Sequence, residues 1–158
     1  MEKEKSWKKW GVLAAWIGGT LALGVIGGLI GGTDQYQNLV KPPLSPPGWV
    51  FPGVWSILYV LMAIGIWLVT QTKQPDTWKA VQIYVYQLLV NVLWPLLFFR
   101  LEWRLFAFFW LLLLLALIAM TYATFRKFSR PAAYLLIPYM LWVLFAGYLN
   151  LSIYVLNG

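Results

Sequence analysis

Aromatic rings and amides deep inside uncharged segments are the side chains of this chain most able to bind a ligand. The sequence holds 11 tryptophans among 158 residues. Trp55 and Tyr59 are four positions apart, and Asn91 and Trp94 are three apart, so each pair shares one face of a helix. Such faces offer rings for stacking and polar groups for orientation, which a flat and mostly apolar ligand requires.

A third set of the same kind follows near the end of the sequence. Trp142, Ala146 and Asn150 repeat every four positions, with Pro138 one step earlier. The small residue leaves room beside the ring and the amide. The same spacing is also typical of rings that fill a bundle core and of amides that join helices by hydrogen bonds. Spacing alone slightly favours this packing interpretation over a ligand site.

Composition excludes several kinds of chemistry. The chain contains no cysteine and no histidine, which excludes disulfides, thiol catalysis, a His-ligated haem or zinc site and a Ser-His-Asp triad. No general acid–base pair or metal site is visible among the other residues. We therefore predict no catalytic residue and no metal ligand.

The distribution of charge predicts the elements that position these side chains. The 12 basic and 5 acidic residues gather at a few places and leave five long stretches without charge. Each stretch can cross about 30 Å of hydrocarbon as a helix of roughly 20 residues. We predict an all-α polytopic membrane protein, a single domain over residues 1–158, with a bundle of five transmembrane helices at about 10–32, 46–70, 78–99, 103–125 and 131–156. No Asp, Glu, Lys or Arg lies deep in a span, which argues against a proton pump or a voltage sensor.

The net charge of +7 comes from basic residues that flank the predicted spans, a pattern that favours a membrane protein over nucleic-acid binding. Nine basic residues fall on one side of a five-span arrangement, whereas Lys41, Arg100 and Arg104 fall on the other. This excess predicts a cytoplasmic N-terminus, with the C-terminus and the 34–47 loop outside and the bacterial cytoplasmic membrane as the location. The first apolar stretch is too long for a typical cleaved signal peptide, so we expect it to remain as a helix.

Local patterns predict how some helices start and pack. Glycines recur at four-residue spacing in the first span, from Gly24 to Gly32, which lets two helix backbones approach closely. Packing within the chain is the favoured interpretation, and a dimer seam is the alternative. Ser45 is expected to cap the second helix, with Pro46 at its first position. The fourth span, a run of Leu, Phe, Trp and Ala, is expected to face lipid.

Four motifs occur in order along the predicted spans. They are LVKPPLSPPG at 39–48, WSILY at 55–59, NVLW at 91–94 with FF at 98–99, and LIPYMLW at 136–142, which continues as FAGYLN at 145–150. Through these motifs the sequence resembles, over essentially its whole length, the TspO family. This family is also known as the tryptophan-rich sensory protein, translocator protein or peripheral benzodiazepine receptor family.

The resemblance implies a five-helix bundle, often dimeric, whose pocket opens toward the first loop. It also implies binding of porphyrins, in particular protoporphyrin IX, and of isoquinoline-carboxamide or benzodiazepine-type ligands. Carried over by motif position, the ligand-binding residues are Tyr36, Trp55, Tyr59, Asn91, Trp94, Trp142, Ala146, Leu149 and Asn150. We expect no obligatory cofactor, and because histidine is absent, metal-free porphyrin is favoured over haem. The lipid bilayer and a homodimer are the other expected partners.

Three functions follow from the resemblance and stay open at this point. The first is a protein that binds and senses tetrapyrroles. The second is an enzyme that degrades protoporphyrin in light, with Trp55 and Trp142 beside the excited porphyrin. The third is a transporter of porphyrin or another lipophile, although no inverted repeat is evident.

Two departures from the family pattern affect selectivity. Many members carry Trp where this loop has Leu44, and an aromatic residue where it has Gln35, so the loop is less aromatic here. Animal members also carry a cholesterol-associated pattern that ends in a basic residue. That residue is missing after Tyr154, so we predict no physiological cholesterol binding.

Overall fold

Helices make up the regular structure in the computed structural model, which describes residues 2–158 of the chain and the side chains from position 5 onward. The elements in order are α1 (Glu2–Gly31), the 3-10 turn η1 (Asp34–Asn38), α2 (Val50–Gln71), α3 (Thr77–Pro95), the π-helical turn η2 (Leu96–Arg100), α4 (Arg104–Phe128), the short α5 (Arg130–Tyr134) and α6 (Ile137–Asn157). Within this range five helical segments are long and apolar enough to cross a membrane; α3 with η2 forms one of them, and α5 with α6 another. The predicted all-α fold with five membrane-crossing helices is therefore confirmed.

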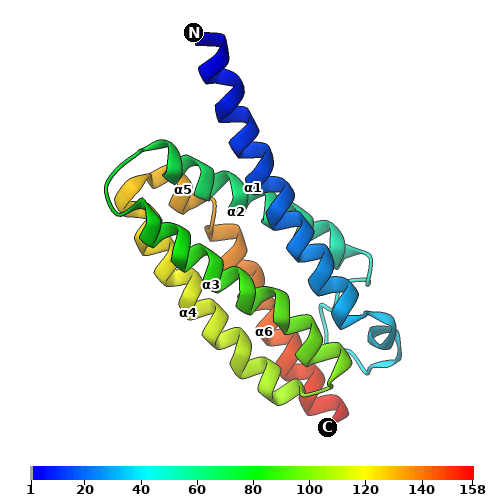
Figure 1. Cartoon of the computed structure of the whole chain (residues 1–158). Coiled ribbons are helices and arrows are strands. Elements are labelled where there is room, and N and C mark those ends of the chain that lie inside the picture. The colour runs from blue at the N-terminus through cyan, green and yellow to red at the C-terminus, as the bar shows by residue number, and fades with distance from the viewer. Residues whose placement is uncertain (1) are drawn as a thin grey trace.

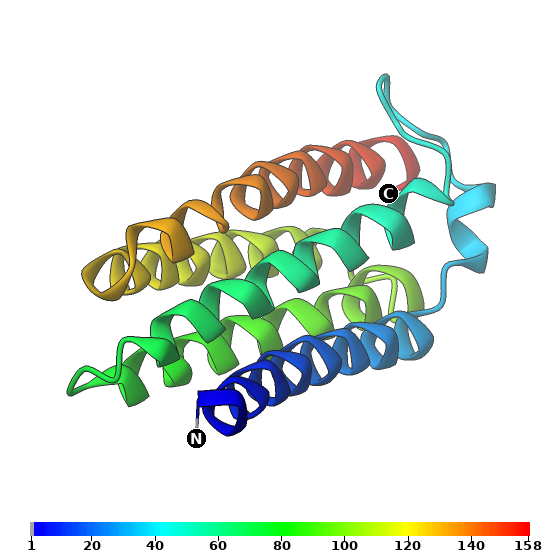
Figure 2. The same cartoon turned by 90° about the horizontal axis from the view of Figure 1, so that it is seen from above.

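The helices form an elongated bundle, and the N-terminal turns of α1 project beyond it (Figure 1). α1 packs against α2 and α3, α4 packs against α3 and α6, and α5 packs against α2 and α4. A view from above places α1 and α6 on opposite sides of the bundle (Figure 2). The α1–α2 loop and the C-terminus share one end, here called the loop end, and α5 and the α2–α3 loop lie at the other, here called the far end.

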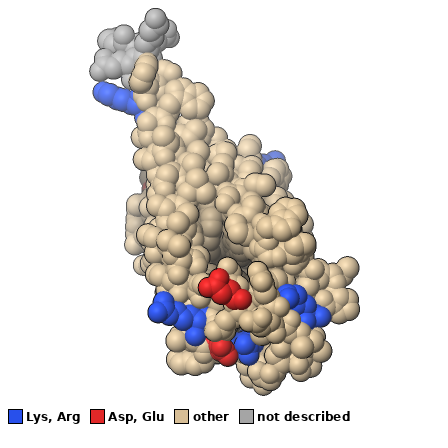
Figure 3. Space-filling view, turned by 90° about the vertical axis from the view of Figure 1, so that its right-hand side faces the viewer, with Lys and Arg blue, Asp and Glu red and all other residues tan. Residues whose placement is uncertain are grey.

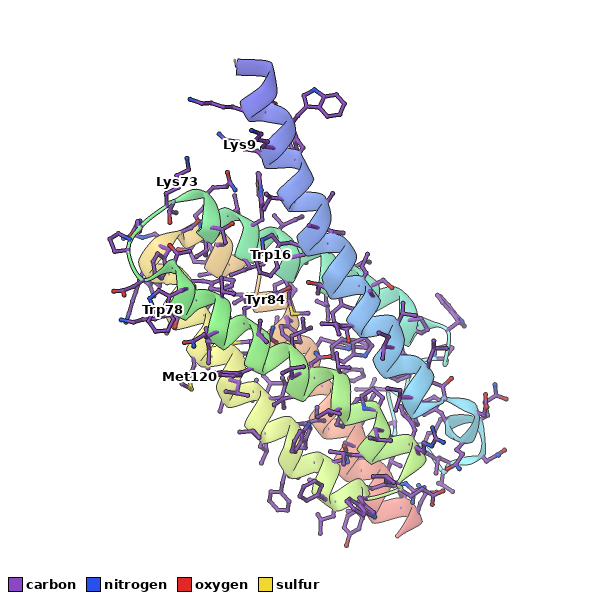
Figure 4. All side chains as sticks on the ribbon, viewed as in Figure 1. Lys9, Trp16, Lys73, Trp78, Tyr84 and Met120 are labelled. Carbon is purple, nitrogen blue, oxygen red and sulfur yellow. The ribbon has the colours of Figure 1, made fainter. Side chains whose placement is uncertain are left out.

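Large side chains fill the bundle toward the far end. The hydroxyl of Tyr84 on α3 lies 2.6 Å from that of Thr20 on α1, and the Trp16 ring meets the Tyr84 ring edge-on with centroids 5.6 Å apart. Figure 4 places Trp16 and Tyr84 in the space between α1 and α3. Phe125 of α4 stacks on Tyr84 at 6.4 Å and also lies against Gly65 of α2. This half is therefore tied together by tight packing across four helices.

α2 begins four residues later than predicted, at Val50 rather than Pro46. The predicted Ser45 cap is wrong, because the Ser45 hydroxyl donates to the Pro42 carbonyl at 2.8 Å and no side chain caps α2. Each proline disfavours the helical conformation in the residue before it, so Ser45 and Pro46 are poor helix starters. The helix begins only after Pro47, whose carbonyl accepts the N–H of Val50 at 3.0 Å.

Prolines also modify the third and fifth spans. α3 ends at Pro95 and continues as the wider π-helical turn η2. The fifth span, predicted as one helix, contains a break, since α5 ends at Tyr134 and α6 begins at Ile137. Pro138 supplies no N–H to the carbonyl of Tyr134, and its ring crowds that carbonyl, so the helix is interrupted just before the proline.

The expectation that the fourth span faces lipid is wrong for one side of α4. Ala107, Leu111, Leu114, Ile118 and Phe125 recur at helical spacing and are buried, so this face packs into the bundle. Apolar residues occupy the opposite side as well, and the sequence therefore has no polar stripe that would mark the buried face. α1, not α4, is the least buried of the five spans.

Candidate ligand-binding site

A cavity of about 630 Å³ lies in the loop half of the bundle, between α1, η1, α2 and α3. This volume is within the range of small-molecule sites. The surface on this side of the molecule is visibly hollowed beside α1 (Figure 3). The cavity is lined by Leu21, Gly24, Val25, Gly28, Thr33, Tyr36, Gln37, Gly48, Trp49, Phe51, Pro52, Trp55, Ser56, Tyr59, Asn91, Trp94, Pro95 and Phe99. None of these lining residues is charged, so the site offers ring faces and neutral hydrogen-bonding groups.

Glycines on α1 shape the cavity. Gly24 lies directly against the Tyr59 ring, which any side chain at this position would overlap. Gly28 borders the cavity, and apart from the adjacent backbone of α1 no atom lies within 4 Å of the place where its Cβ would be. A Cβ at Gly27 would lie 2.8 Å from the carbonyl oxygen of Val92 on α3. The glycine spacing thus serves close packing within the chain, and a homodimer stays a prediction.

Tyr36 of η1 covers the cavity at the loop end. Its ring meets Phe51 edge-on at 5.2 Å, and its hydroxyl donates to the Pro46 carbonyl at 3.1 Å. Burial raises the pKa of Tyr36, an effect that a hydrogen bond with Ser45 partly offsets. The hydroxyl is therefore protonated at neutral pH and able to donate. The Lys41 ammonium lies 4.9 Å from the centre of the Tyr36 ring, which brings a positive charge to the rim of the cavity.

Two tryptophans of the lining are held by contacts on their other sides. Trp55 stacks on Tyr59 with centroids 5.7 Å apart and meets Trp142 of α6 edge-on at 6.4 Å. The indole N–H of Trp94 donates to Oδ1 of Asn150 at 3.0 Å, which ties α3 to α6. Both rings are thereby oriented before any ligand arrives, which lowers the entropy cost of binding.

A chain of buried hydrogen bonds forms the floor of the cavity toward the far end. The Tyr59 hydroxyl donates to Oδ1 of Asn91 at 2.7 Å, and Nδ2 of Asn91 donates to the Tyr139 oxygen at 2.5 Å. The Tyr139 hydroxyl donates in turn to Oε1 of Gln87 at 2.9 Å, and Nε2 of Gln87 approaches the Met62 sulfur at 3.7 Å. The chain joins α2, α3 and α6 and gives each of these buried polar side chains a partner.

The structure brings together five of the nine predicted site residues. Those that line the cavity are Tyr36, Trp55, Tyr59, Asn91 and Trp94. Those that do not line it are Trp142, Ala146, Leu149 and Asn150, and all four belong to α6. Trp142 contacts the Trp55 ring of α2, and Asn150 bonds to Trp94 of α3, so these two α6 residues lie against the cavity wall from behind.

Each α6 residue has a definite place in the packing. Trp142 borders a second, more open groove of about 490 Å³ between α2 and α6. Its indole nitrogen is buried and has no hydrogen-bond partner within the described residues. Ala146 and Leu149 are buried in the core, and Asn150 accepts the hydrogen bond of Trp94.

Several residues of the site were not predicted from the sequence. Phe51 and Phe99 line the cavity, but nothing in their spacing distinguishes them from the many other aromatic residues of the spans. Gln87 and Tyr139 are buried members of the hydrogen-bond chain. The four-residue spacing of Gln87 and Asn91, which places both amides on one face of α3, was the available signal.

Comparisons with known proteins identify the family. The model of the TspO/MBR family matches residues 16–156, a range that contains all four motifs and every residue of the cavity lining. The chain is similar to the tryptophan-rich protein TspO of Chlorobaculum tepidum, with 37% identity over 150 residues that cover 92% of this chain and 95% of the relative. It is similar to the tryptophan-rich sensory protein of Cereibacter sphaeroides, with 30% identity over 148 residues, 94% of this chain and 92% of the relative. It is also similar to the translocator protein of Homo sapiens, with 36% identity over 126 residues, 78% of this chain and 75% of the relative. Together with the five apolar spans, these matches show that the chain belongs to the TspO/MBR family of integral membrane proteins.

Proposed function

We propose that this protein binds a flat, lipophilic tetrapyrrole, with protoporphyrin IX as the expected ligand, in the cavity between α1, η1, α2 and α3. The observation that carries the proposal is an uncharged cavity of about 630 Å³ whose walls include the rings of Trp55, Tyr59 and Trp94. Aromatic walls stack on an extended π system. Isoquinoline-carboxamide and benzodiazepine-type ligands are also flat and apolar, so the same walls suit them.

The carboxylates of a porphyrin would lie best at the rim of the cavity, beside Lys41. Burying a carboxylate among neutral residues costs several kcal/mol, and no residue of the cavity lining is cationic. Lys41 lies against Tyr36 and also donates to the Gln37 carbonyl at 3.3 Å, so it stands at the rim. The propionates of a porphyrin therefore point toward the loop end, with the macrocycle deeper in the cavity.

We further propose that the far end is cytoplasmic and that the protein resides in the bacterial cytoplasmic membrane. Lys9 and Lys73 both project at the far end (Figure 4), and Arg126 and Arg130 flank the start of α5 at the same end. Basic residues concentrate on the cytoplasmic side of membrane proteins. In this orientation the cavity and its Tyr36 cover lie in the outer half of the membrane.

The binding proposal is tested by titrating the detergent-purified protein with protoporphyrin IX in the dark and following tryptophan quenching. Wild type is compared with Trp55→Phe and Asn91→Ala, and Trp103→Phe serves as a control because Trp103 is 57% exposed and does not line the cavity. Saturable binding that weakens about tenfold in the two cavity variants supports the proposal. Linear quenching that is the same in all four proteins would show partitioning into the micelle and would overturn it.

A second function, degradation of the bound porphyrin in light, is favoured by one contact. Trp55 lines the cavity, and Trp142 meets it edge-on at 6.4 Å from the opposite side. A porphyrin excited against Trp55 has an indole electron donor in contact and a second indole behind it, with dioxygen as the final oxidant. More than one product molecule per protein, lost in Trp55→Phe at porphyrin concentrations that still saturate this variant in the dark, would support turnover. A single product or fewer per protein would show photodamage instead.

A further inference from the structure

The hydrogen-bond chain at the cavity floor runs in one direction, from Tyr59 and Asn91 toward Gln87 and Met62. Nε2 of Gln87 faces the Met62 sulfur, which can only accept, so Oε1 of Gln87 faces Tyr139. Tyr139 must give its one proton to this oxygen, and its own oxygen therefore accepts from Nδ2 of Asn91. Oδ1 of Asn91 is then turned toward Tyr59 and accepts its proton. The orientation of the Asn91 amide is thus set by Tyr139 and Gln87, the next two residues of the hydrogen-bond chain.

This direction determines what the floor presents to a ligand. Asn91 lines the cavity, and its amide group has two N–H bonds, of which Tyr139 accepts one. The second N–H has no partner in the part of the chain that the structure describes. Tyr59 has already given its proton to Asn91, so its oxygen can only accept. A ligand at the floor consequently meets one free N–H donor.

Neither Tyr139 nor Gln87 contacts the cavity, and both are fully buried. Phe and Leu would fill similar space in this apolar bundle without polar atoms that need partners. Buried polar networks are most valuable where they hold one side chain in one orientation. That side chain is Asn91, since it is the member of the hydrogen-bond chain that both lines the cavity and has an N–H left over.

We propose that Tyr139 and Gln87 are positioning residues that hold the Asn91 amide in one orientation, so that its free N–H recognises an electron-rich acceptor on the ligand. The acceptor is a carbonyl oxygen in a carboxamide ligand or the π face of a macrocycle, because N–H groups also donate to π faces. This inference rests on the proposed binding of a flat lipophile in the cavity. In this proposal, two residues that do not contact the ligand determine which ligand groups the cavity floor accepts.

The orientation itself is tested without any ligand. The sequence has only four asparagines, Asn38, Asn91, Asn150 and Asn157, so protein labelled with ¹⁵N in asparagine side chains gives few NMR signals, and Asn91→Ala identifies the one of interest. In Tyr139→Phe the Asn91 amide pair is expected to shift and to exchange faster with solvent, while the other three pairs stay in place. Gln87→Leu is expected to shift the same pair less, because Tyr139 then lacks an acceptor.

Tyr84→Phe is the matched control. Tyr84 is as deeply buried as Tyr139, and its hydroxyl also bonds to a side chain, but that side chain is Thr20, which is not part of the Asn91 chain. An Asn91 signal that is unchanged in Tyr139→Phe would overturn the inference. So would a signal that moves equally in Tyr84→Phe, since that would indicate general loosening of the bundle.

A double-mutant cycle with protoporphyrin IX in the dark tests the consequence for binding. Tyr139→Phe is expected to weaken binding about fivefold to tenfold, and Tyr84→Phe less than about twofold. If Tyr139 acts through Asn91, the double variant Tyr139→Phe/Asn91→Ala binds no worse than Asn91→Ala alone. Multiplying effects would show independent roles and overturn the inference. If wild type does not bind protoporphyrin at all, the proposed function fails, whereas the NMR result still decides the orientation.

Discussion

The seam between α1 and α3 runs the length of the bundle, and its two halves are filled differently. One face of α1 carries Trp16, Thr20, Gly24 and Gly28 at four-residue spacing. Toward the far end, Trp16 and Thr20 both meet Tyr84 and close the space. Toward the loop end, the two glycines provide no side chain, and the cavity begins there. Side-chain size along one helix face therefore decides which half of the bundle is packed and which is hollow.

The buried tyrosines of the two halves differ in how far their hydrogen bonds extend. Tyr84 has a single hydroxyl partner, Thr20, and the pair ends there. Tyr59 begins a chain that passes through Asn91 and Tyr139 to the other side of the bundle. A closed pair serves to join two helices, whereas a chain that reaches the cavity also determines which polar group the cavity offers.

The largest effect is expected for a substitution in the far half, which should lower the stability of the protein but leave ligand binding in the loop half unchanged. Phe125→Ala removes a ring that packs on Tyr84 and against Gly65, so it should lower the free energy of unfolding by about 3 kcal/mol. Protoporphyrin affinity of the folded variant should stay within about twofold, because Phe125 is remote from the cavity lining. Denaturant unfolding in detergent and a dark titration measure the two quantities. A large loss of affinity in the folded variant would mean that the two halves are coupled.

Filling the cavity should weaken binding strongly without unfolding the protein. Leu at Gly28 has free space for its side chain, and that space is the cavity. We expect Gly28→Leu to weaken protoporphyrin binding roughly 100-fold, because the ligand and the new side chain compete for one volume. Gly18→Leu is the matched control on the same helix, since its Cβ also meets no described atom within 4 Å but Gly18 does not line the cavity. Equal affinities of the two variants would place the ligand elsewhere.

The cover of the cavity should matter less than its volume. Tyr36→Ala removes a ring that packs on Phe51, and we expect about tenfold weaker binding and faster ligand release. Tyr36→Phe keeps the ring, loses the hydroxyl that donates to Pro46, and should weaken binding about twofold to threefold. Because burial raises the pKa of Tyr36, the wild-type bond should persist from about pH 6 to pH 9 and be lost above the raised pKa. Affinity that falls between pH 7 and pH 8 would contradict this role.

The smallest effect is expected for a residue that the family resemblance places in the site. Trp142 stands behind Trp55 and does not line the cavity. Trp142→Phe should therefore change dark protoporphyrin affinity by only about twofold to threefold, through looser packing of Trp55. Titrations of Trp142→Phe and Trp55→Phe side by side provide the measurement. An effect of Trp142→Phe as large as that of Trp55→Phe would show that the ligand reaches past α2 to α6.

The sequence predicted the spans well because each charged residue is costly in hydrocarbon, so charged residues mark where a span ends. It predicted their ends less well. The start of α2 depends on the consecutive prolines Pro46 and Pro47, and the break before α6 depends on Pro138. Both follow from local steric rules, but the rules for a helix start and for a proline in a helix compete at these positions. The buried face of α4 was unpredictable, since leucine and phenylalanine occupy all its sides.

The candidate site was predicted in part for a similar reason. Spacing and motif position pointed to Trp55, Tyr59, Asn91 and Trp94, and these do line one cavity. They also pointed to the α6 set, because Trp142 lies at helical spacing from a small residue, Ala146, and an amide, Asn150. Spacing tells which residues share a helix face, but not which neighbouring helix that face meets.

By itself the sequence determined an uncharged, aromatic interior crossed by five helices, together with the chemistry that such an interior excludes. These properties depend on residue type alone. Burying a charge in hydrocarbon is costly in any fold, and a chain without cysteine has no thiol chemistry in any fold. Only the tertiary structure decided that Gly28 borders open space, that Trp142 lies behind the cavity wall and that Tyr139 orients Asn91. Cavities and hydrogen-bond chains depend on how separate helices approach one another, and that arrangement is a property of the packed bundle rather than of any one segment.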